Sequence, residues 1–251
     1  MVTGGSRGLG AATGRVLAEV GFDVAITYRE DRGGAERAAA TVAGAGRQTA
    51  LYELDLADLT AVASIGSLIA SRHRPAVLVN NAGETFRGDI STTKTPAVQR
   101  MLNVNVAAPI VLTRELAPAL SSHEEAGSIV NVSSISGIAG SSNAVYASTK
   151  AAVLGLTRSL AVELAPAVRV NAVIPGVFDT DMNHDALADE RVRKAALGAI
   201  PLRRIGDPTE LASVVAFLAG PGSSYITGAC VSVDGGVLAT VALDRSESED
   251  S

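Results

Sequence analysis

The sequence predicts an α/β fold with one doubly wound parallel sheet of about seven strands, the first of them truncated. Two observations predict it: short β-branched runs alternate with longer helical stretches, and the runs are apolar throughout rather than alternating with polar residues. Both features are typical of a parallel sheet whose two faces are covered by helices. Because no repeat and no Pro/Gly-rich linker divides the chain, residues 1–243 are predicted to form a single domain.

The predicted elements follow one another in a regular order. A first strand ends at Val2, and six more are expected at 22–28, 48–54, 76–80, 128–133, 168–174 and 229–234. Helical patterns lie between them at 10–20, 34–43, 58–72, 96–120, 143–164 and 208–219. The last residues, 244–251, are acidic with nothing apolar to bury, so we expect a disordered tail.

Composition excludes several classes of protein. The net charge of −5 argues against a nucleic-acid or anionic-membrane partner. A hydrophobic share of 47% allows a sizeable core, which must use aliphatic side chains because aromatic residues make up only 3%. The single cysteine, Cys230, excludes an internal disulfide, suits a reducing compartment and is expected in the core. With no leader-like or membrane-length apolar segment in the sequence, we expect a cytoplasmic protein.

The glycine-rich turn from Thr3 to Gly10 has the composition of a phosphate-binding loop. If a strand ends at Val2 and a helix begins near Gly10, the backbone N–H groups of the turn can point at a pyrophosphate, as in Rossmann-type domains. Such domains that prefer NAD carry an acidic residue at the end of the second strand, where this chain has Tyr28 and Arg29. Arg29 and Arg7 could instead pair with a 2′-phosphate, or could both be solvated surface residues.

Polar residues follow the next two predicted strands. Asp55 and Leu56 come after the third strand, and Asn80 to Gly83 after the fourth. Ligands bind at the carboxyl ends of strands in open α/β sheets. Asp55 could equally be a helix N-cap, and the asparagines could equally be turn residues that tolerate left-handed backbone.

Tyr146 and Lys150 are four residues apart in a predicted helix, so their side chains share one face. A nearby cation stabilises a phenolate and lowers the phenol pKa, which gives a group able to exchange a proton with an alcohol or carbonyl. Upstream, the run Asn131 to Ser134 ends a strand and can bring a hydroxyl to the same place.

Taken together, these segments resemble the short-chain dehydrogenase/reductase family. The matching segments are TGGSRGLG at residue 3, DL at 55, NNAG at 80, NVN at 103, NVSS at 131, YASTK at 146, NAVIPGVFDTDM at 171 and VDGG at 233. They cover residues 2–237 in the order of the family. The segments PLRRIGDP at 201 and VDGG are most similar to those of β-ketoacyl carrier protein reductases.

The resemblance implies roles for individual residues. Tyr146 would be the general acid/base, and Lys150 would activate it and bind the nicotinamide ribose. Ser134 would orient the substrate carbonyl. Asn105 would hold a water that links Lys150 to solvent. Residues 178–202 would be a mobile substrate lid. The cofactor, NADPH or NADP rather than NAD, would be bound by Gly4, Ser6, Arg7, Gly8, Leu9, Gly10, Tyr28, Arg29, Asp55, Leu56, Asn81, Ala82, Gly83, Tyr146, Lys150, Pro175, Gly176, Phe178 and Thr180. No metal site is expected.

The spacing departs from the family pattern at the catalytic serine. Tyr146 lies 12 residues after Ser134, one fewer than is usual in the family. Ser133 would restore the count, but alignment on Asn131 favours Ser134, with the deletion in the loop 141–143.

The predicted function is reduction of a ketone, possibly a β-ketoacyl thioester, to a secondary alcohol by an NADPH-dependent homotetramer. The alternatives are a sugar, steroid or xenobiotic alcohol dehydrogenase of the same family, and a non-catalytic NADP-binding regulator. The regulator is disfavoured because all four catalytic residues are present.

The shortness of the first predicted strand leads to an expectation about where the native chain begins. A central strand normally buries several apolar residues at about 1.5–3 kcal/mol each, so losing three or four forfeits about 5–12 kcal/mol. That is comparable to the whole stability of a typical domain, about 5–15 kcal/mol. We therefore expect the native chain to begin several residues upstream with a short apolar strand. The alternative is that tetramer contacts and bound cofactor rescue the shorter form.

Overall fold

The six strands of the fold run parallel. The computed structural model describes residues 1–86, 88–124 and 126–240, so the tail expected at 244–251 lies outside the described residues. Within that part the strands are β1 (Val24–Tyr28), β2 (Thr49–Glu53), β3 (Val77–Asn80), β4 (Gly127–Val132), β5 (Val168–Pro175) and β6 (Cys230–Val233). β1 pairs with β2, and β3 to β6 pair in sequence order.

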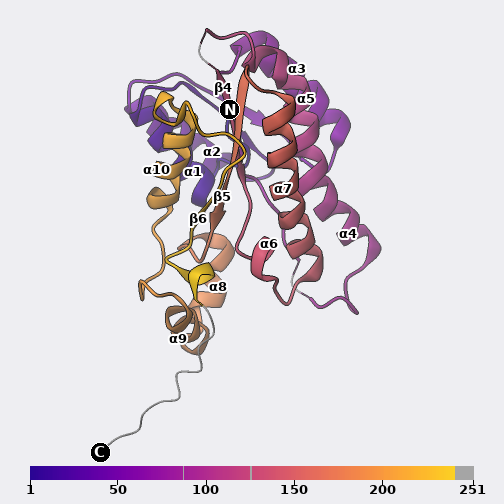
Figure 1. Cartoon of the computed structure of the whole chain (residues 1–251), viewed down its shortest axis with the longest axis vertical. Helices are drawn as coiled ribbons and strands as arrows, with labels where there is room; N and C mark the ends of the chain where they lie inside the picture. Colours follow the sequence, from indigo (N-terminus) through magenta and orange to yellow (C-terminus); the bar gives the residue numbers. More distant parts are fainter. Residues whose placement is uncertain (87, 125, 241–251) are drawn as a thin grey trace, which may run out of the picture.

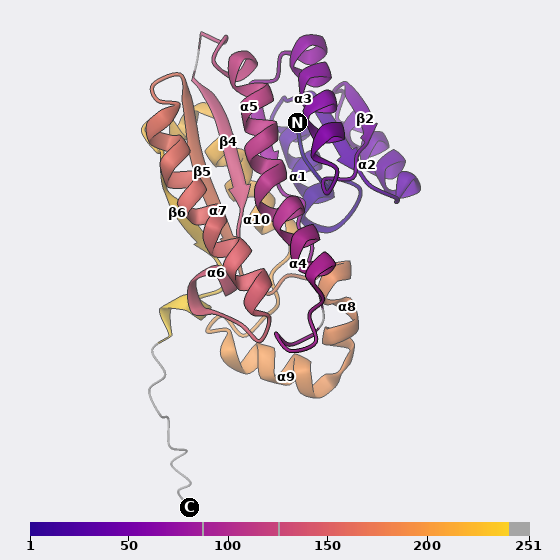
Figure 2. The same ribbon diagram turned by 90° about the vertical axis from the view of Figure 1, so that its right-hand side faces the viewer.

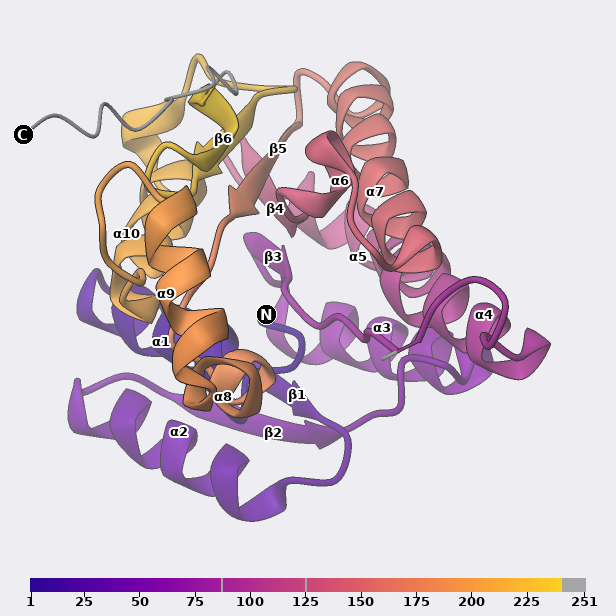
Figure 3. The same ribbon diagram turned by 90° about the horizontal axis from the view of Figure 1, so that it is seen from below.

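The first residues of the chain join these two groups of strands into one sheet. Val2 pairs in parallel with Ile26 on one side and with Val79 on the other. The Val2 N–H donates to the Ala25 carbonyl at 2.8 Å, while the Met1 carbonyl accepts from the Val79 N–H at 2.9 Å. Figure 3 shows the N-terminus between β3 and β1. The sheet is thus doubly wound about this central segment, as predicted, and the expectation of a longer first strand stays a prediction.

Helices cover both faces of the sheet (Figure 1). α1 (Gly8–Glu19), α2 (Arg32–Gly44) and α10 (Pro208–Ala219) lie on one face, and α3 (Leu59–His73), α5 (Ala108–Leu120) and α7 (Ala144–Glu163) on the other. Successive strand residues point to opposite faces. Val79 and Val130 accordingly pack in the core beneath α1 and α10, whereas Leu78 and Ile129 pack in the core beneath α3 and α5.

Short polar side chains fix where several of these helices begin. Asp58 accepts hydrogen bonds from the backbone N–H groups of Thr60 and Ala61 and so caps α3. Asn143 caps α7 through the N–H of Tyr146 at 3.0 Å. These are the side chains that best satisfy the unpaired N–H groups of a first helical turn.

The single helix predicted at 96–120 is wrong in detail. The chain forms α4 (Thr95–Leu102), then a π-helical turn over Asn103–Ala107, and only then α5. The turn carries Asn105, which is 2% exposed and makes hydrogen bonds outside its own helix. Hydrophobic periodicity could not show this, because the irregular turn is stabilised by partners far away in sequence. Such π-turns are frequent at functional sites.

Short helices gather beyond the carboxyl ends of the strands. α6 (Ser136–Ala139) precedes α7, while α8 (Asp181–Ala188) and α9 (Glu190–Ala199) lie together below the sheet in Figures 1 and 2. The segment 178–202, expected to be a lid, is therefore largely helical. Short 3₁₀ turns at Pro221–Ser223 and Val237–Ala239 complete the described chain. Across the described residues, no helix is both long and apolar enough to cross a membrane.

Candidate active site

A cavity of about 530 Å³ opens at the carboxyl ends of the strands, beside the central segment. This is the point at which the strand order reverses, where open α/β sheets bind their ligands. Fourteen of the predicted cofactor-binding residues line it: Gly4, Ser6, Arg7, Gly8, Leu9, Gly10, Tyr28, Arg29, Asp55, Leu56, Asn81, Ala82, Gly83 and Thr180.

The glycine turn has the shape that close approach of a phosphate requires. Gly4 and Gly8 have φ of +62° and +53°, a left-handed backbone that favours glycine. A Cβ on Gly10 would lie only 2.2 Å from the Gly4 carbonyl oxygen. α1 begins at Gly8, so the N–H groups of its first turn and the positive end of its dipole face the cavity. The turn therefore fits a pyrophosphate.

Asn80 and Asn81 act through their side chains rather than as left-handed turn residues. Neither has a positive φ. The Asn80 amide donates to Asn131 Oδ1 at 2.8 Å and links the ends of β3 and β4. The Asn81 amide donates to the Thr3 carbonyl at 2.8 Å, which holds the glycine turn against the end of β3.

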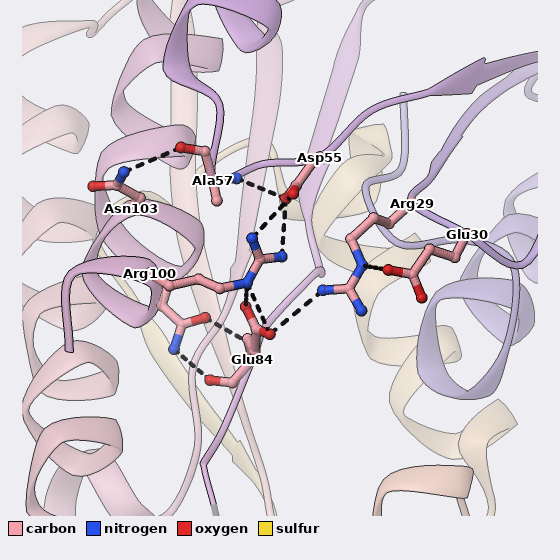
Figure 4. A network of polar contacts seen from close by, with 8 residues as sticks. Arg29, Glu30, Asp55, Ala57, Glu84, Arg100 and Asn103 are labelled. Carbon is pink, nitrogen blue, oxygen red and sulfur yellow. Dashed lines mark hydrogen bonds and ion pairs between the residues drawn. The ribbon is translucent and has the colours of Figure 1, made fainter. Parts of the chain in front are cut away.

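Five of the charged side chains that line the cavity, those of Arg29, Glu30, Asp55, Glu84 and Arg100, form one network (Figure 4). Arg100 makes a two-pronged contact with Asp55, with both N–O distances at 3.0 Å, and its Nε lies 2.8 Å from Glu84. Arg29 reaches the same Glu84 at 3.4 Å and Glu30 at 2.9 Å. Hydrogen bonding to Arg100 is the main reason why the pKa of Asp55 lies below its ordinary value. Asp55 is thus an ion-pair partner, and the N-cap of α3 is Asp58.

Tyr146, Ser134 and Lys150 converge beside this cavity. Ser134 hydrogen bonds to the Tyr146 phenol, and Lys150 Nζ lies 5.8 Å from the centre of the phenol ring. Lys150 Nζ also donates to the Val132 carbonyl at 2.9 Å. A Cβ built on Gly83, which lines the cavity, would lie 3.1 Å from Lys150 Nζ. The absence of a side chain at Gly83 therefore leaves the amine next to the cavity.

The two neighbouring serines have different surroundings. The Ser133 hydroxyl is buried and donates to the Lys150 carbonyl at 2.7 Å, so it ties the end of β4 to α7. Ser134 presents its hydroxyl to Tyr146 and accepts from the Ser136 N–H at 3.1 Å. This geometry supports Ser134, rather than Ser133, as the hydroxyl of the site.

Burial shifts both titrating groups of the pair. It raises the pKa of Tyr146, an effect that the Ser134 hydrogen bond only partly opposes. It also lowers the pKa of Lys150 to about 8. The sequence-based expectation was a phenol pKa lowered by the cation. In the fold the shift has the opposite direction, because desolvation disfavours the charged forms of both groups.

Asn105 connects this group to the cavity wall. Its Oδ1 accepts from the Glu84 N–H at 2.8 Å, and its amide donates to the Glu84 carbonyl at 2.9 Å and to Thr149 Oγ1 at 3.0 Å. Thr149 lies directly before Lys150 and donates to the Tyr146 carbonyl. The π-helical turn thus holds both α7 and the segment that follows β3.

Several predicted residues lie outside the cavity lining. Pro175 ends β5, and Phe178 is buried against Gly206. Gly176 packs against Asp234, where a Cβ would lie 2.7 Å from its Cα. These three residues therefore do not contribute to the cavity lining.

Sequence reasoning missed part of the lining: Thr27, Glu30, Asp31, Leu54, Glu84, Thr85, Arg100 and Val104. Glu84 could have been found, because it directly follows the NNAG segment at a predicted strand end. Arg100 could not, because nothing local links it to Asp55, 45 residues earlier.

Known proteins are similar to this chain over most of its length. The family model described as enoyl-(acyl carrier protein) reductase matches residues 4–238. The chain is 36% identical over 242 residues to the 3-oxoacyl-[acyl-carrier-protein] reductase MabA of Mycobacterium tuberculosis, covering 94% of this chain and 91% of that one.

Two solved structures share the fold at a TM-score of 0.90. A putative short-chain alcohol dehydrogenase from Sinorhizobium meliloti is 32% identical, with 96% of each chain covered. A putative NAD(P)-dependent gluconate 5-dehydrogenase from Beutenbergia cavernae, with bound NADP, is 35% identical and covers 95% of this chain and 96% of that one.

Proposed function

The chain belongs to the short-chain dehydrogenase/reductase family of NAD(P)-dependent oxidoreductases, and we propose that it uses NADPH to reduce a ketone to a secondary alcohol. A β-ketoacyl thioester is the first candidate substrate, because MabA is named for that chemistry. The observation that carries the proposal is the convergence of Ser134, Tyr146 and Lys150 beside a cleft with a phosphate-binding turn.

Each residue has a chemical task in this proposal. Ser134 donates a hydrogen bond to the substrate carbonyl and orients it. Tyr146 gives its phenolic proton to the carbonyl oxygen as the alcohol forms. Lys150 holds the ribose and, when protonated, stabilises the resulting phenolate. Asn105 keeps the segment after β3 and the catalytic helix in register.

The cleft fits a nicotinamide dinucleotide. Gly4, Gly8 and Gly10 would admit its pyrophosphate, and Arg29 would meet the 2′-phosphate. A bound nicotinamide supplies a hydride to the carbonyl carbon when a ketone is reduced. The segment 178–202 would close over the substrate, since Thr180 lines the same cavity as Gly8 and a Cβ built on Gly8 would lie 3.4 Å from its methyl group.

A panel assay tests the proposal. NADPH consumption is followed with β-ketoacyl thioesters and simple ketones, and NADP reduction with gluconate and secondary alcohols. The proposal expects the highest kcat/KM with a β-ketoacyl thioester. A clear preference for gluconate would favour the sugar dehydrogenase that the second structural relative suggests. Cofactor binding without turnover of any substrate would favour a regulator.

NADPH is expected to be preferred over NADH by more than about tenfold in kcat/KM, because charged hydrogen bonds are worth about 1.5–3 kcal/mol each. β1 ends at Tyr28 and Arg29 follows it, so no carboxylate occupies the position that recognises a ribose 2′-hydroxyl. Steady-state rates with both cofactors measure the ratio. Equal efficiencies would contradict the assignment of Arg29 to the 2′-phosphate.

A homotetramer is proposed as the functional assembly. Apolar side chains remain exposed on the outer helices: Val162 of α7 is 82% exposed and Ile110 of α5 is 46% exposed. Large exposed apolar patches mark interaction sites, and we propose that these side chains are buried against other copies of the chain. Light scattering at micromolar concentration is expected to give about four times the chain mass, and a monomeric mass would refute the proposal.

A further inference from the structure

Glu84 connects two arginines across the cofactor cleft. Arg100 Nε lies 2.8 Å and Arg29 Nη1 3.4 Å from its carboxylate oxygens (Figure 4). Its side chain is 31% exposed, whereas that of Glu30, the other carboxylate on Arg29, is 77% exposed. Of the two, Glu84 is the carboxylate that water screens less.

The position of Glu84 is fixed by its backbone and by Arg100. Asn105 holds both its N–H and its carbonyl, at 2.8 and 2.9 Å. Arg100 is itself held by two hydrogen bonds to Asp55. The carboxylate therefore stays at the wall of the cavity, where it faces any anion that approaches Arg29.

In this arrangement the Glu84 carboxylate and the 2′-phosphate of NADPH would compete for the Arg29 guanidinium. The cavity lining carries three arginines and four carboxylates, a net charge of −1, although its proposed ligand is an anion. A phosphate that pairs with Arg29 competes with Glu84 for the guanidinium and lies close to the carboxylate that Arg100 retains. The ribose 2′-hydroxyl of NADH is uncharged, so it does not compete with Glu84 for Arg29 and is not repelled by the Glu84 carboxylate.

From this geometry we propose that Glu84 sets the cofactor preference by weakening recognition of the 2′-phosphate by Arg29. The inference rests on the proposed function, which assigns the 2′-phosphate to Arg29. Glu84 is in this sense a specificity-determining residue. It reduces the margin by which NADPH is favoured over NADH.

The test measures dissociation constants of NADPH and NADH by cofactor fluorescence, without substrate. Glu84→Gln keeps the shape of the side chain and its backbone contacts but removes the charge. It is expected to tighten NADPH binding about threefold to tenfold, the range of a partly exposed ion pair plus the relieved repulsion. NADH binding is expected to change less than twofold, on the order of experimental error for an uncharged group.

Two further variants separate the proposed contact from a general charge effect. Glu19→Gln removes a carboxylate that pairs with Arg15 on the surface of α1, away from the cavity, and is expected to leave both constants unchanged. In an Arg29→Ala background, Glu84→Gln is expected to lose its NADPH-selective effect, because the cycle isolates the coupling between the two side chains. Melting temperatures confirm that each variant is folded.

Several results would overturn the inference. An unchanged or weakened NADPH constant in Glu84→Gln contradicts it. So does equal tightening of both cofactors, or an NADPH-selective gain that persists in Arg29→Ala. If the unmodified protein binds neither cofactor, the proposed function fails as well. Normal binding of both with no response at Glu84 leaves the proposed function intact and removes only this inference.

Discussion

Tyr146→Phe is expected to lower kcat by about 10²–10⁴-fold, the usual contribution of a positioned proton donor. The substitution removes only the phenolic oxygen, the atom that Ser134 hydrogen bonds, from a ring whose centre lies 5.8 Å from Lys150 Nζ. The ring and the helix N-cap at Asn143 remain, so the fold and the cofactor site are retained. Cofactor affinity is therefore expected to stay within about twofold of the unmodified protein, since no charged contact is lost.

Steady-state kinetics with NADPH and the ketone substrate, and a dissociation constant for the cofactor, are measured for each variant. Lys150→Ala is the matched comparison: it removes the amine beside Gly83 and is expected to lower both turnover and cofactor affinity. A Tyr146→Phe enzyme that keeps more than about a hundredth of the activity would contradict the acid/base assignment. A large loss of cofactor affinity in that variant would show that the phenol acts in binding.

The fold could be predicted because it depends on patterns that are local in sequence. Apolar runs such as 76–80 and 168–174 became β3 and β5 because strands buried on both faces must be apolar throughout. The order of strands and helices then leaves few topologies, since parallel crossovers are short and right-handed. The predicted single helix at 96–120 failed because Asn105 is stabilised by Glu84 and Thr149, contacts that periodicity does not encode.

The candidate site was predictable where a backbone shape or a strand end marks it. Gly4 and Gly8 require their left-handed backbone, and Asn81 follows β3 directly. The ion-pair network was not predictable. Arg29 was considered a phosphate ligand or a solvated residue, but it is paired with carboxylates. Arg100 pairs with Asp55 and Glu84, and Arg29 with Glu84, across stretches of sequence that only the tertiary fold brings together.

The pH dependence of stability is expected to show that Lys150 is buried without a counter-charge. In the ligand-free fold, desolvation lowers its pKa to about 8, against an ordinary value of 10.5. Between these values the unfolded chain binds more protons than the folded chain at this group, so stability rises with pH. Below about pH 8 both states are protonated, and the cost of the buried charge is constant and fully present.

A variant without the amine isolates this contribution. Lys150→Met keeps an unbranched side chain but cannot titrate. When its melting temperature is subtracted from that of the unmodified protein, the pH dependence contributed by all other groups cancels. Raising the pH from 7.5 to 9.5 is expected to favour the unmodified protein by about 2 kcal/mol, the linkage value for those two pKa values. For a chain of this length that corresponds to a relative gain of about 4–8 °C.

Thermal melts of both proteins at the two pH values, without cofactor, provide the measurement. A temperature difference that stays constant would mean that Lys150 keeps its ordinary pKa in the fold, with an anionic partner nearby. If the difference in melting temperature instead changes with pH as expected, burial without water lowers the pKa of the Lys150 amine. An anionic cofactor that binds nearby would then favour the protonated amine.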